Sequence, residues 1–171
     1  MDVKLVNDMN LALEIMRQAS RWMTANGIPV MDSWRLENLN ARAMLENYGA
    51  TDKDFYVCYI DGAAAGARIL VNAKGAYRGL LPYGFENSLY TGKGCAADGF
   101  HGGKYSALMM NAVKDKARAE GYDSVVLDTG KHQPKLCALF ESMGFKKIDS
   151  FSGDGDGYEW LVYEYKLKDE K

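Results

Sequence analysis

The stretch FHGGKYSALMM, residues 100–110, predicts a glycine-rich turn that leads directly into an apolar helix. Free N–H groups and the positive end of the helix dipole converge at such a helix start, so a polyanion is favoured there. Apolar residues recur at Leu108, Met109, Ala112 and Val113, and Gly121 ends the helical pattern. The stretch alone leaves open which polyanion it binds.

The segments on either side alternate between strand and helix patterns and form one α/β domain over residues 1–171. Two of the strands meet at Asp61-Gly62, a strong hairpin signal. Pro134 is placed for the first position of a helix. Strands are predicted at 2–6, 54–62, 63–71, 88–97, 124–129, 145–151 and 158–167; helices run from Asn7 or Asp8 to Gly27, from Ser33 to Gly49, and from Pro134 to Gly144; residues 72–87 are predicted as a loop.

Composition excludes several classes of protein. The 171 residues are 47% hydrophobic and 26% charged with a net charge of −2, and no basic run suggests nucleic-acid binding. No apolar stretch approaches the roughly 18 residues that span a membrane, and the N-terminus does not resemble a secretory signal. Three cysteines predict a reduced, cytoplasmic chain, and two histidines without a CxxC pair predict no metal site.

Three nucleotide or metal motifs fail on inspection. A P-loop around Gly103-Lys104 has Asp98 where the first glycine belongs and Tyr105 where a hydroxyl should bind magnesium. A dinucleotide fingerprint over 92–97 is separated from the helix by Asp98-Gly99. The DGDG run at 154–157 lacks the other calcium ligands of an EF-hand, so it predicts a hairpin turn.

The remaining pattern resembles the GNAT superfamily of N-acetyltransferases. The family's strand that ends in small apolar residues aligns with Cys95-Ala96, and its glycine turn aligns with residues 101–106. A second family motif, later in the sequence, aligns with residues 133–145. The alignment needs no gaps. The resemblance covers roughly residues 54–165 and extends more loosely to the N-terminal helices. It implies a mixed central sheet of about seven strands, flanked by about four helices and splayed between strands 4 and 5.

The resemblance also implies that acetyl-CoA is the co-substrate. Its pyrophosphate would lie on the N–H groups of residues 102–106, and its pantetheine arm would pair with the fourth strand. A bulge at Gly92 or Gly94 would help to separate the fourth strand from the fifth. Lys104 either pairs with a phosphate or is a solvated helix-start lysine, and Ser106 could serve as the N-cap. The implied donor-binding residues are Cys95, Ala96, Ala97, His101, Gly102, Gly103, Lys104, Tyr105, Ser106, Gln133 and Phe140.

Catalysis is harder to predict. Many family members place a tyrosine at position 140 as the general acid, whereas Phe140 has no proton to give. Candidate bases for the acceptor ammonium are Glu86, Tyr90 and Asp128. Each has a structural alternative: a loop charge, core-edge packing and a turn cap, respectively. Cys95 lacks a companion histidine, so it is interpreted as a buried small residue rather than a nucleophile.

The predicted activity is transfer of an acetyl group to a primary amine by direct attack in a ternary complex. The amine belongs to a small molecule or, as a second choice, to a peptide N-terminus or lysine, and Trp34 and Arg35 are predicted to line its pocket. The alternative is an acyl-CoA-binding sensor or structural module with this fold and little catalysis. We expect no nucleic-acid, membrane or metal partner, and a homodimer is possible because it is common among relatives.

Overall fold

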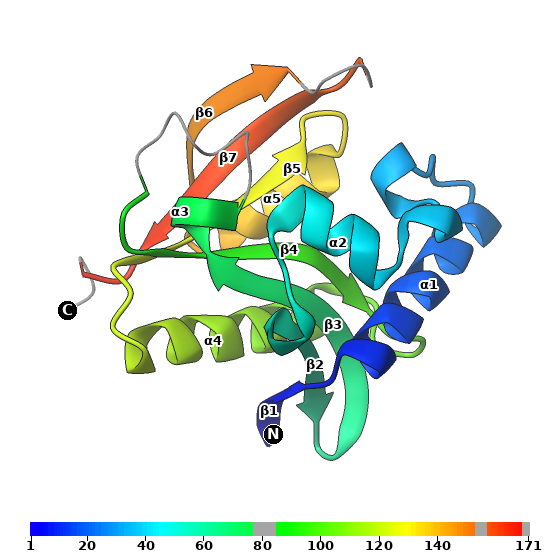
Figure 1. Cartoon of the computed structure of the whole chain (residues 1–171), viewed down its shortest axis with the longest axis horizontal. Coiled ribbons are helices and arrows are strands. Elements are labelled where there is room, and N and C mark those ends of the chain that lie inside the picture. The colour runs from blue at the N-terminus through cyan, green and yellow to red at the C-terminus, as the bar shows by residue number, and fades with distance from the viewer. Residues whose placement is uncertain (77–84, 153–156, 169–171) are drawn as a thin grey trace.

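A computed structural model describes residues 1–76, 85–152 and 157–168. Its strands form one mixed sheet in the order β1-β2-β3-β4-β5-β7-β6 (Figure 1). All neighbouring strands are antiparallel except β4 and β5, which are parallel. The strand bounds are β1 (Val3–Asn7), β2 (Phe55–Ile60), β3 (Ala63–Asn72), β4 (Ser88–Ala96), β5 (Ser124–Gly130), β6 (Lys146–Ser152) and β7 (Glu159–Lys166).

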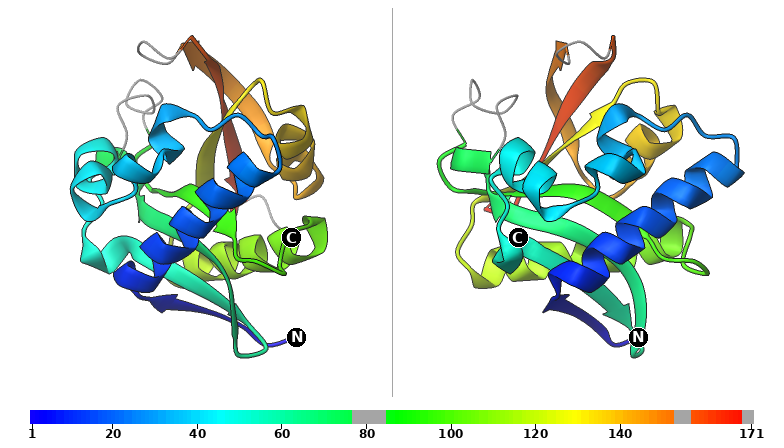
Figure 2. Two further views of the ribbon diagram at one scale, coloured as in Figure 1. Left: turned by 90° about the vertical axis from the view of Figure 1, so that its right-hand side faces the viewer. Right: turned by 45° about the vertical axis from the view of Figure 1, so that its right-hand side comes forward.

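Helices cover both faces of the sheet (Figures 1 and 2). The apolar residues of α1 and α2 pack with Tyr90, Val126 and Val162 of the sheet in one cluster. Those of α4 and α5 pack with Leu89, Leu127 and other strand residues in a second cluster on the opposite face. The helix bounds are α1 (Met9–Ala25), α2 (Ala41–Tyr48), α3 (Ala73–Ala76), α4 (Gly103–Ala119) and α5 (Pro134–Ser142), with 3₁₀ turns η1 (Asp32–Trp34), η2 (Leu36–Asn38) and η3 (Asp52–Asp54).

The N-terminal helices begin differently from each other. The predicted cap of α1 is confirmed, because the Asp8 carboxylate accepts from the N–H of Leu11. The prediction of one continuous helix from Ser33 was wrong, since η1 and η2 precede α2. The side chains of Asn38 and Asn40 donate to backbone carbonyls of residues 32 and 37, which stabilises turns in place of a helix. Asn40 then caps α2, and Gly49 ends it at φ 66°.

The connections bear out some predictions and change others. Asp61 and Gly62 both have positive φ, 49° and 81°, and join β2 to β3 as the predicted hairpin. Residues 73–76, predicted as part of a loop, form the short helix α3, whose first turn is supported by an Asn72 side chain that accepts from the N–H of Lys74. The rest of that loop from 77 to 84, and Asp154 and Asp156 of the DGDG run, lie outside the described residues.

Strands β4 and β5 diverge along their length. They pair only from Ser88–Tyr90 to Ser124–Val126, although β4 continues to Ala96 and β5 to Gly130. The predicted splay between strands 4 and 5 is therefore confirmed, and it leaves the β5-facing edge of β4 unpaired beyond Tyr90 among the described residues.

The predicted bulge lies within this unpaired stretch. Ala67 pairs with Cys95 and Ile69 with Gly92, so Lys93 and Gly94 together oppose the single residue Arg68. Lys93 takes the left-handed conformation at φ 53°. A Cβ at position 94 would lie 2.5 Å from a guanidinium nitrogen of Arg68, so any side chain there requires the end of Arg68 to shift. The bulge is thus built from a lysine flanked by glycines.

Candidate active site

The predicted anion-binding turn lies at the start of α4. Gly102 is the N-cap residue at φ 129°, and the N–H of Ser106 donates to its carbonyl at 3.1 Å. The N–H groups of Gly103, Lys104 and Tyr105 precede that bond and have no helical acceptor. Ser106 therefore lies in the first turn, and its prediction as N-cap was wrong, because Gly102 occupies that position. The turn offers consecutive backbone donors to an anion.

The side chains around this turn take separate directions. Lys104 is exposed, lies 5.7 Å from the centroid of the Tyr105 ring and has no ion pair among residues 1–76, 85–152 and 157–168. Tyr105 packs edge-on against Phe100 at 5.1 Å. The ring of His101 instead stacks on Trp22 of α1, with centroids 4.0 Å apart and an interplanar angle of 13°. Its buried Nε2 has no hydrogen-bond partner among the described residues, and it lies 4.0 Å from a carboxylate oxygen of Asp98. The ring of His101 therefore ties the turn to α1.

Helix α5 lies beside the beginning of α4. A Cβ on Gly103 would be 3.5 Å from Leu139, so the two helices approach closely there. Gln133 precedes α5, and the predicted N1 position of Pro134 is confirmed. The ring of Phe140 packs near Phe145 and the ring of Tyr163, at 6.1 and 6.3 Å. Position 140 thus contributes apolar packing and no proton donor.

The end of β4 presents one edge to the gap between β4 and β5. Cys95 and Ala96 pair with β3, and the N–H of Ala97 donates to the carbonyl of Ala65 at 2.8 Å. The other edge of β4 at Cys95 and Ala96, which faces the gap, is available to an extended chain of amides. The thiol of Cys95 contacts the carbonyl of Ala67, and burial raises its pKa to about 12. A thiol with such a pKa stays protonated at neutral pH, so the geometry does not favour Cys95 as a nucleophile.

Two of the candidate bases meet where β4 and β5 part. The hydroxyl of Tyr90 on β4 donates to the carboxylate of Asp128 on β5 at 2.5 Å. Burial raises the pKa of Asp128, while the hydrogen bond from Tyr90 and the positive charge of Lys93 act in the opposite direction. Tyr90 itself is only 2% exposed. This pair places a shielded carboxylate at the floor of the gap.

Lys93 completes this cluster, and the sequence analysis missed it. Its ammonium donates to the carbonyl of Ser33 and lies 4.5 Å from the centroid of the Trp34 ring. Burial lowers the pKa of Lys93 to about 7, against the attraction of the Asp128 charge. The available signal was a lysine between two glycines inside a strand with no other charged residue, because a buried lysine there needs partners.

The third candidate base lies elsewhere. The carboxylate of Glu86, 74% exposed, forms an ion pair at 2.9 Å with Lys74 of α3, and it has no contact with Tyr90 or Asp128 among the described interactions. The two predicted acceptor residues also separate. Trp34 faces Lys93, whereas Arg35 is exposed and pairs with Asp32 at 3.1 Å.

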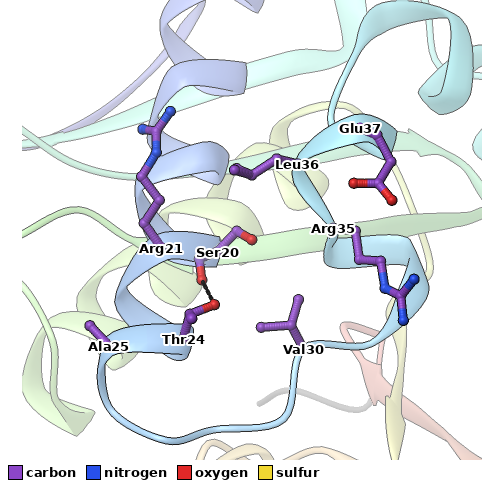
Figure 3. A pocket seen from close by; sticks show the side chains of 8 residues that line it. All are labelled: Ser20, Arg21, Thr24, Ala25, Val30, Arg35, Leu36 and Glu37. Atoms are coloured by element: carbon purple, nitrogen blue, oxygen red, sulfur yellow. Dashed lines mark hydrogen bonds between the residues drawn. The ribbon is translucent and has the colours of Figure 1, made fainter.

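Arg35 lines a pocket of about 460 Å³ between α1 and the segment that follows it (Figure 3). In the figure, Val30 and Leu36 point into the pocket, while Arg21 and Arg35 stand on opposite sides of it. The hydroxyl of Ser20 donates to the carbonyl of Trp34 at 2.7 Å, so this pocket adjoins the segment that contacts Lys93. The lining residues are Ser20, Arg21, Thr24, Ala25, Val30, Arg35, Leu36 and Glu37.

The described residues contain no group of three or more His, Cys, Asp or Glu side chains that could hold a metal ion. Among the same residues, no helix is both long and apolar enough to cross a membrane.

Solved structures share this fold at low sequence identity. A GNAT-family acetyltransferase from Listeria monocytogenes matches with a TM-score of 0.67 and 17% identity, covering 96% of this chain and 95% of that one. The aminoglycoside acetyltransferase AAC(6')-Ib, in complex with coenzyme A, matches with a TM-score of 0.70 and 14% identity over 98% and 96% of the two chains.

A mutant form of the spermidine/spermine N-acetyltransferase SpeG from Vibrio cholerae matches with a TM-score of 0.60 and 15% identity, over 98% and 96% of the chains. No curated protein matches the chain in sequence. The model of the acetyltransferase (GNAT) family matches residues 31–145, which include the strand splay, the anion-binding turn and the start of α5. The chain therefore belongs to the GNAT family of acetyltransferases.

Proposed function

We propose that this protein transfers an acetyl group from acetyl-CoA to a primary amine by direct attack in a ternary complex. The observation that carries the proposal is the gap between β4 and β5. It has unsatisfied helix N–H groups at its outer end and the Tyr90–Asp128 pair at its floor. Acetyl transfer from acetyl-CoA requires a site for the pyrophosphate at one end of the gap. It also requires ionisable groups near the thioester at the other end.

The donor fits the residues around the gap. The N–H groups of residues 103–105 and the side chain of Lys104 suit a pyrophosphate, since both supply positive potential at an exposed helix start. The free edge at Cys95–Ala97 suits the amides of a pantetheine arm. Bound in this way, the arm runs from the turn back along β4, so its reactive end reaches the bulge at Lys93 and Gly94.

The acceptor is proposed to approach from the face that carries α1 and η1. The pocket beside Trp34 is on this face, and 460 Å³ falls within the usual range for small-molecule sites. In its ionised form the Asp128 carboxylate attracts an ammonium toward the gap, and burial, which raises its pKa, favours its taking a proton there. Its bond to Tyr90 makes this pair the candidate base, whereas the exposed position of Glu86 beside Lys74 gives a role in catalysis no support.

The test is a thiol-release screen with acetyl-CoA and a panel of amines that includes aminoglycosides, polyamines, amino acids and a lysine peptide. We expect amine-dependent release of CoA and a product heavier by one acetyl group. Asp128→Asn should reduce that release while leaving CoA binding, followed by calorimetry, nearly unchanged. If the wild type does not bind CoA, the proposed function is wrong.

One observation favours the second candidate, an acyl-CoA-binding sensor. Phe140 has no hydroxyl for the departing thiolate and is packed among aromatic rings. Tight CoA binding together with no amine-dependent thiol release across the panel would support the sensor. Loss of the acid need not abolish transfer, because a thiolate is a fair leaving group with a thiol pKa of about 8.5.

A further inference from the structure

Lys93 is placed by the bulge rather than by the regular alternation of a strand. Lys93 and Gly94 share one position of the β3 register, and the left-handed backbone of Lys93 turns its side chain toward η1. A Cβ at Gly92 would contact the ring of Tyr90 at 2.8 Å, so residues 90, 92 and 93 all face the α1 side. The bulge therefore brings a lysine to the side from which the acceptor approaches.

The amine of Lys93 sits among groups suited to an ammonium ion. It has the carbonyl of Ser33 as acceptor, the face of the Trp34 ring at 4.5 Å and the negative charge of Asp128 across the gap. The residue is only 7% exposed, so water does little to stabilise its charge. Burial lowers the pKa of Lys93 to about 7, which leaves both protonation states accessible near neutral pH.

We propose that Lys93 is a catalytic residue that takes a proton from the acceptor nitrogen and delivers it to the sulfur of the departing CoA thiolate. This role rests on the proposed function. It places Lys93 at the bulge that the reactive end of the donor arm reaches, on the acceptor side of that end. It also supplies the proton donor that Phe140 cannot be.

The proton balance is as follows. The acceptor ammonium loses one proton to the carboxylate of Asp128, which passes it on to solvent, and the nitrogen lone pair forms the new C–N bond with the thioester carbonyl carbon. The C–S bond breaks, and its electron pair leaves with sulfur. The second nitrogen proton passes to the neutral amine of Lys93 and then to that sulfur. Lys93 ends in the state in which it began, and the products are the amide, the CoA thiol and one released proton.

The groups that face Lys93 set the direction of its pH dependence. Desolvation disfavours the ammonium form, and the charge of Asp128 on β5 favours it, while the thiol of Cys95 on β4 stays neutral near pH 7. Tyr90 reaches Lys93 only through its bond to Asp128. Asp32 of η1 and Arg35, which follows η1, are exposed and pair with each other. Because Lys93 must be neutral to take a proton, kcat/KM is expected to rise through a pKa near 7.

The activity test compares Lys93→Met, Lys93→Arg and the exposed control Lys131→Met. Arginine keeps the positive charge but does not release a proton near neutral pH. We expect kcat to fall by about 100-fold or more in both Lys93 variants, within the usual contribution of acid–base catalysis, with CoA affinity and acceptor KM changed little. The control should keep wild-type activity, and the limb near pH 7 should be absent from the residual rates of the Lys93 variants.

The second measurement needs no substrate. A ¹³C NMR titration of lysine Cε resonances in the wild-type protein, with the Lys93 signal assigned by its loss in Lys93→Arg, should show one lysine titrating near pH 7. A Lys93 that titrates with the surface lysines near pH 10 overturns the proposal whatever the activity. The proposal is also overturned if the wild type is active and Lys93→Arg is equally active. It is likewise overturned if Lys93→Met changes only KM. A wild type without amine-dependent thiol release contradicts the proposed function instead.

Discussion

The hydroxyl of Tyr90 and the carboxylate of Asp128 are joined by a 2.5 Å hydrogen bond across the line where β4 and β5 part. Tyr90 belongs to the last residue pair that the two strands share. The bond therefore closes the gap at its floor and holds a shielded carboxylate there. Substitution of either residue is therefore expected to change the structure at the floor of the gap.

Removing one side of this bond should show how strongly the pair is coupled. Tyr90→Phe leaves the half-buried carboxylate of Asp128 without this donor, and we expect a loss of about 1–3 kcal/mol in the free energy of unfolding. A double-mutant cycle with Asp128→Ala, which removes the acceptor oxygens, followed by urea unfolding at pH 7, measures the coupling. If the two single changes add without interaction, the bond is not energetically significant.

Lys104→Glu tests the anion-binding turn. Reversing the charge at an exposed helix start should weaken CoA binding by at least about tenfold, because the phosphates lose an attraction and meet a repulsion. Calorimetry at two salt concentrations checks this, and the difference should shrink at the higher one. Lys4→Glu on β1, distant in sequence and paired with Asp2, is the matched control. Equal affinity for both variants would place the pyrophosphate elsewhere.

Gly66→Ala tests the contact between β3 and α4. A Cβ at this position would lie 2.5 Å from the carbonyl oxygen of Cys95 and 2.6 Å from the sulfur of Met109. The backbone oxygen cannot move aside as a side chain can, so we expect a loss of about 1–3 kcal/mol in stability. Gly94→Ala, which meets the movable end of Arg68, should cost less. Thermal unfolding of both variants gives the comparison, and the reverse order would contradict it.

The lowered pKa of Lys93 has a signature in stability. In the folded chain the pKa is about 7 and in the unfolded chain it returns toward 10.5, so the unfolded state binds more protons between these values. The free energy of unfolding should therefore gain a component that rises with pH, by about 1 kcal/mol per unit. Urea unfolding at pH 8, 9 and 10 should show a smaller slope in Lys93→Met. Parallel slopes would mean that Lys93 is not perturbed.

Phe140→Tyr asks whether the proton donor is truly missing. With Lys93 intact, we expect kcat to change by no more than about threefold, because a donor is already present. In the Lys93→Met background the new hydroxyl should raise kcat by about tenfold or more. Steady-state rates of the four proteins at pH 7.5 decide this. A large gain in the wild-type background would show instead that Lys93 does not protonate the thiolate.

The fold and the glycine turn before α4 could be predicted because their signals are local. Glycines at 102 and 103, Pro134 and the Asp61-Gly62 hairpin act within a few residues, and the family pattern over residues 95–145 fixed their order. The start of α2 could not be predicted in this way, because the side chains of Asn38 and Asn40 compete for backbone carbonyls that a helix would use.

The acceptor side depends on contacts between distant residues. Lys93 and Ser33 are 60 residues apart, and Tyr90 and Asp128 are 38 apart. Tyr90 and Asp128 could be proposed from their residue types, but their meeting follows only from the pairing of β4 with β5. The burial of Lys93 depends on the bulge and on η1, and Glu86 is held away from the pair by Lys74. Periodicity carries no information on such distances.

The three residue pairs between β4 and β5 have a mechanical consequence. They are the backbone seam between a four-stranded half, β1 to β4, and a three-stranded half, β5 to β7. Beyond this seam the two halves are held together, among the described residues, by side chains of the two core clusters and not by backbone hydrogen bonds. An extended molecule seated in the gap would add hydrogen bonds between the halves where the sheet itself has none.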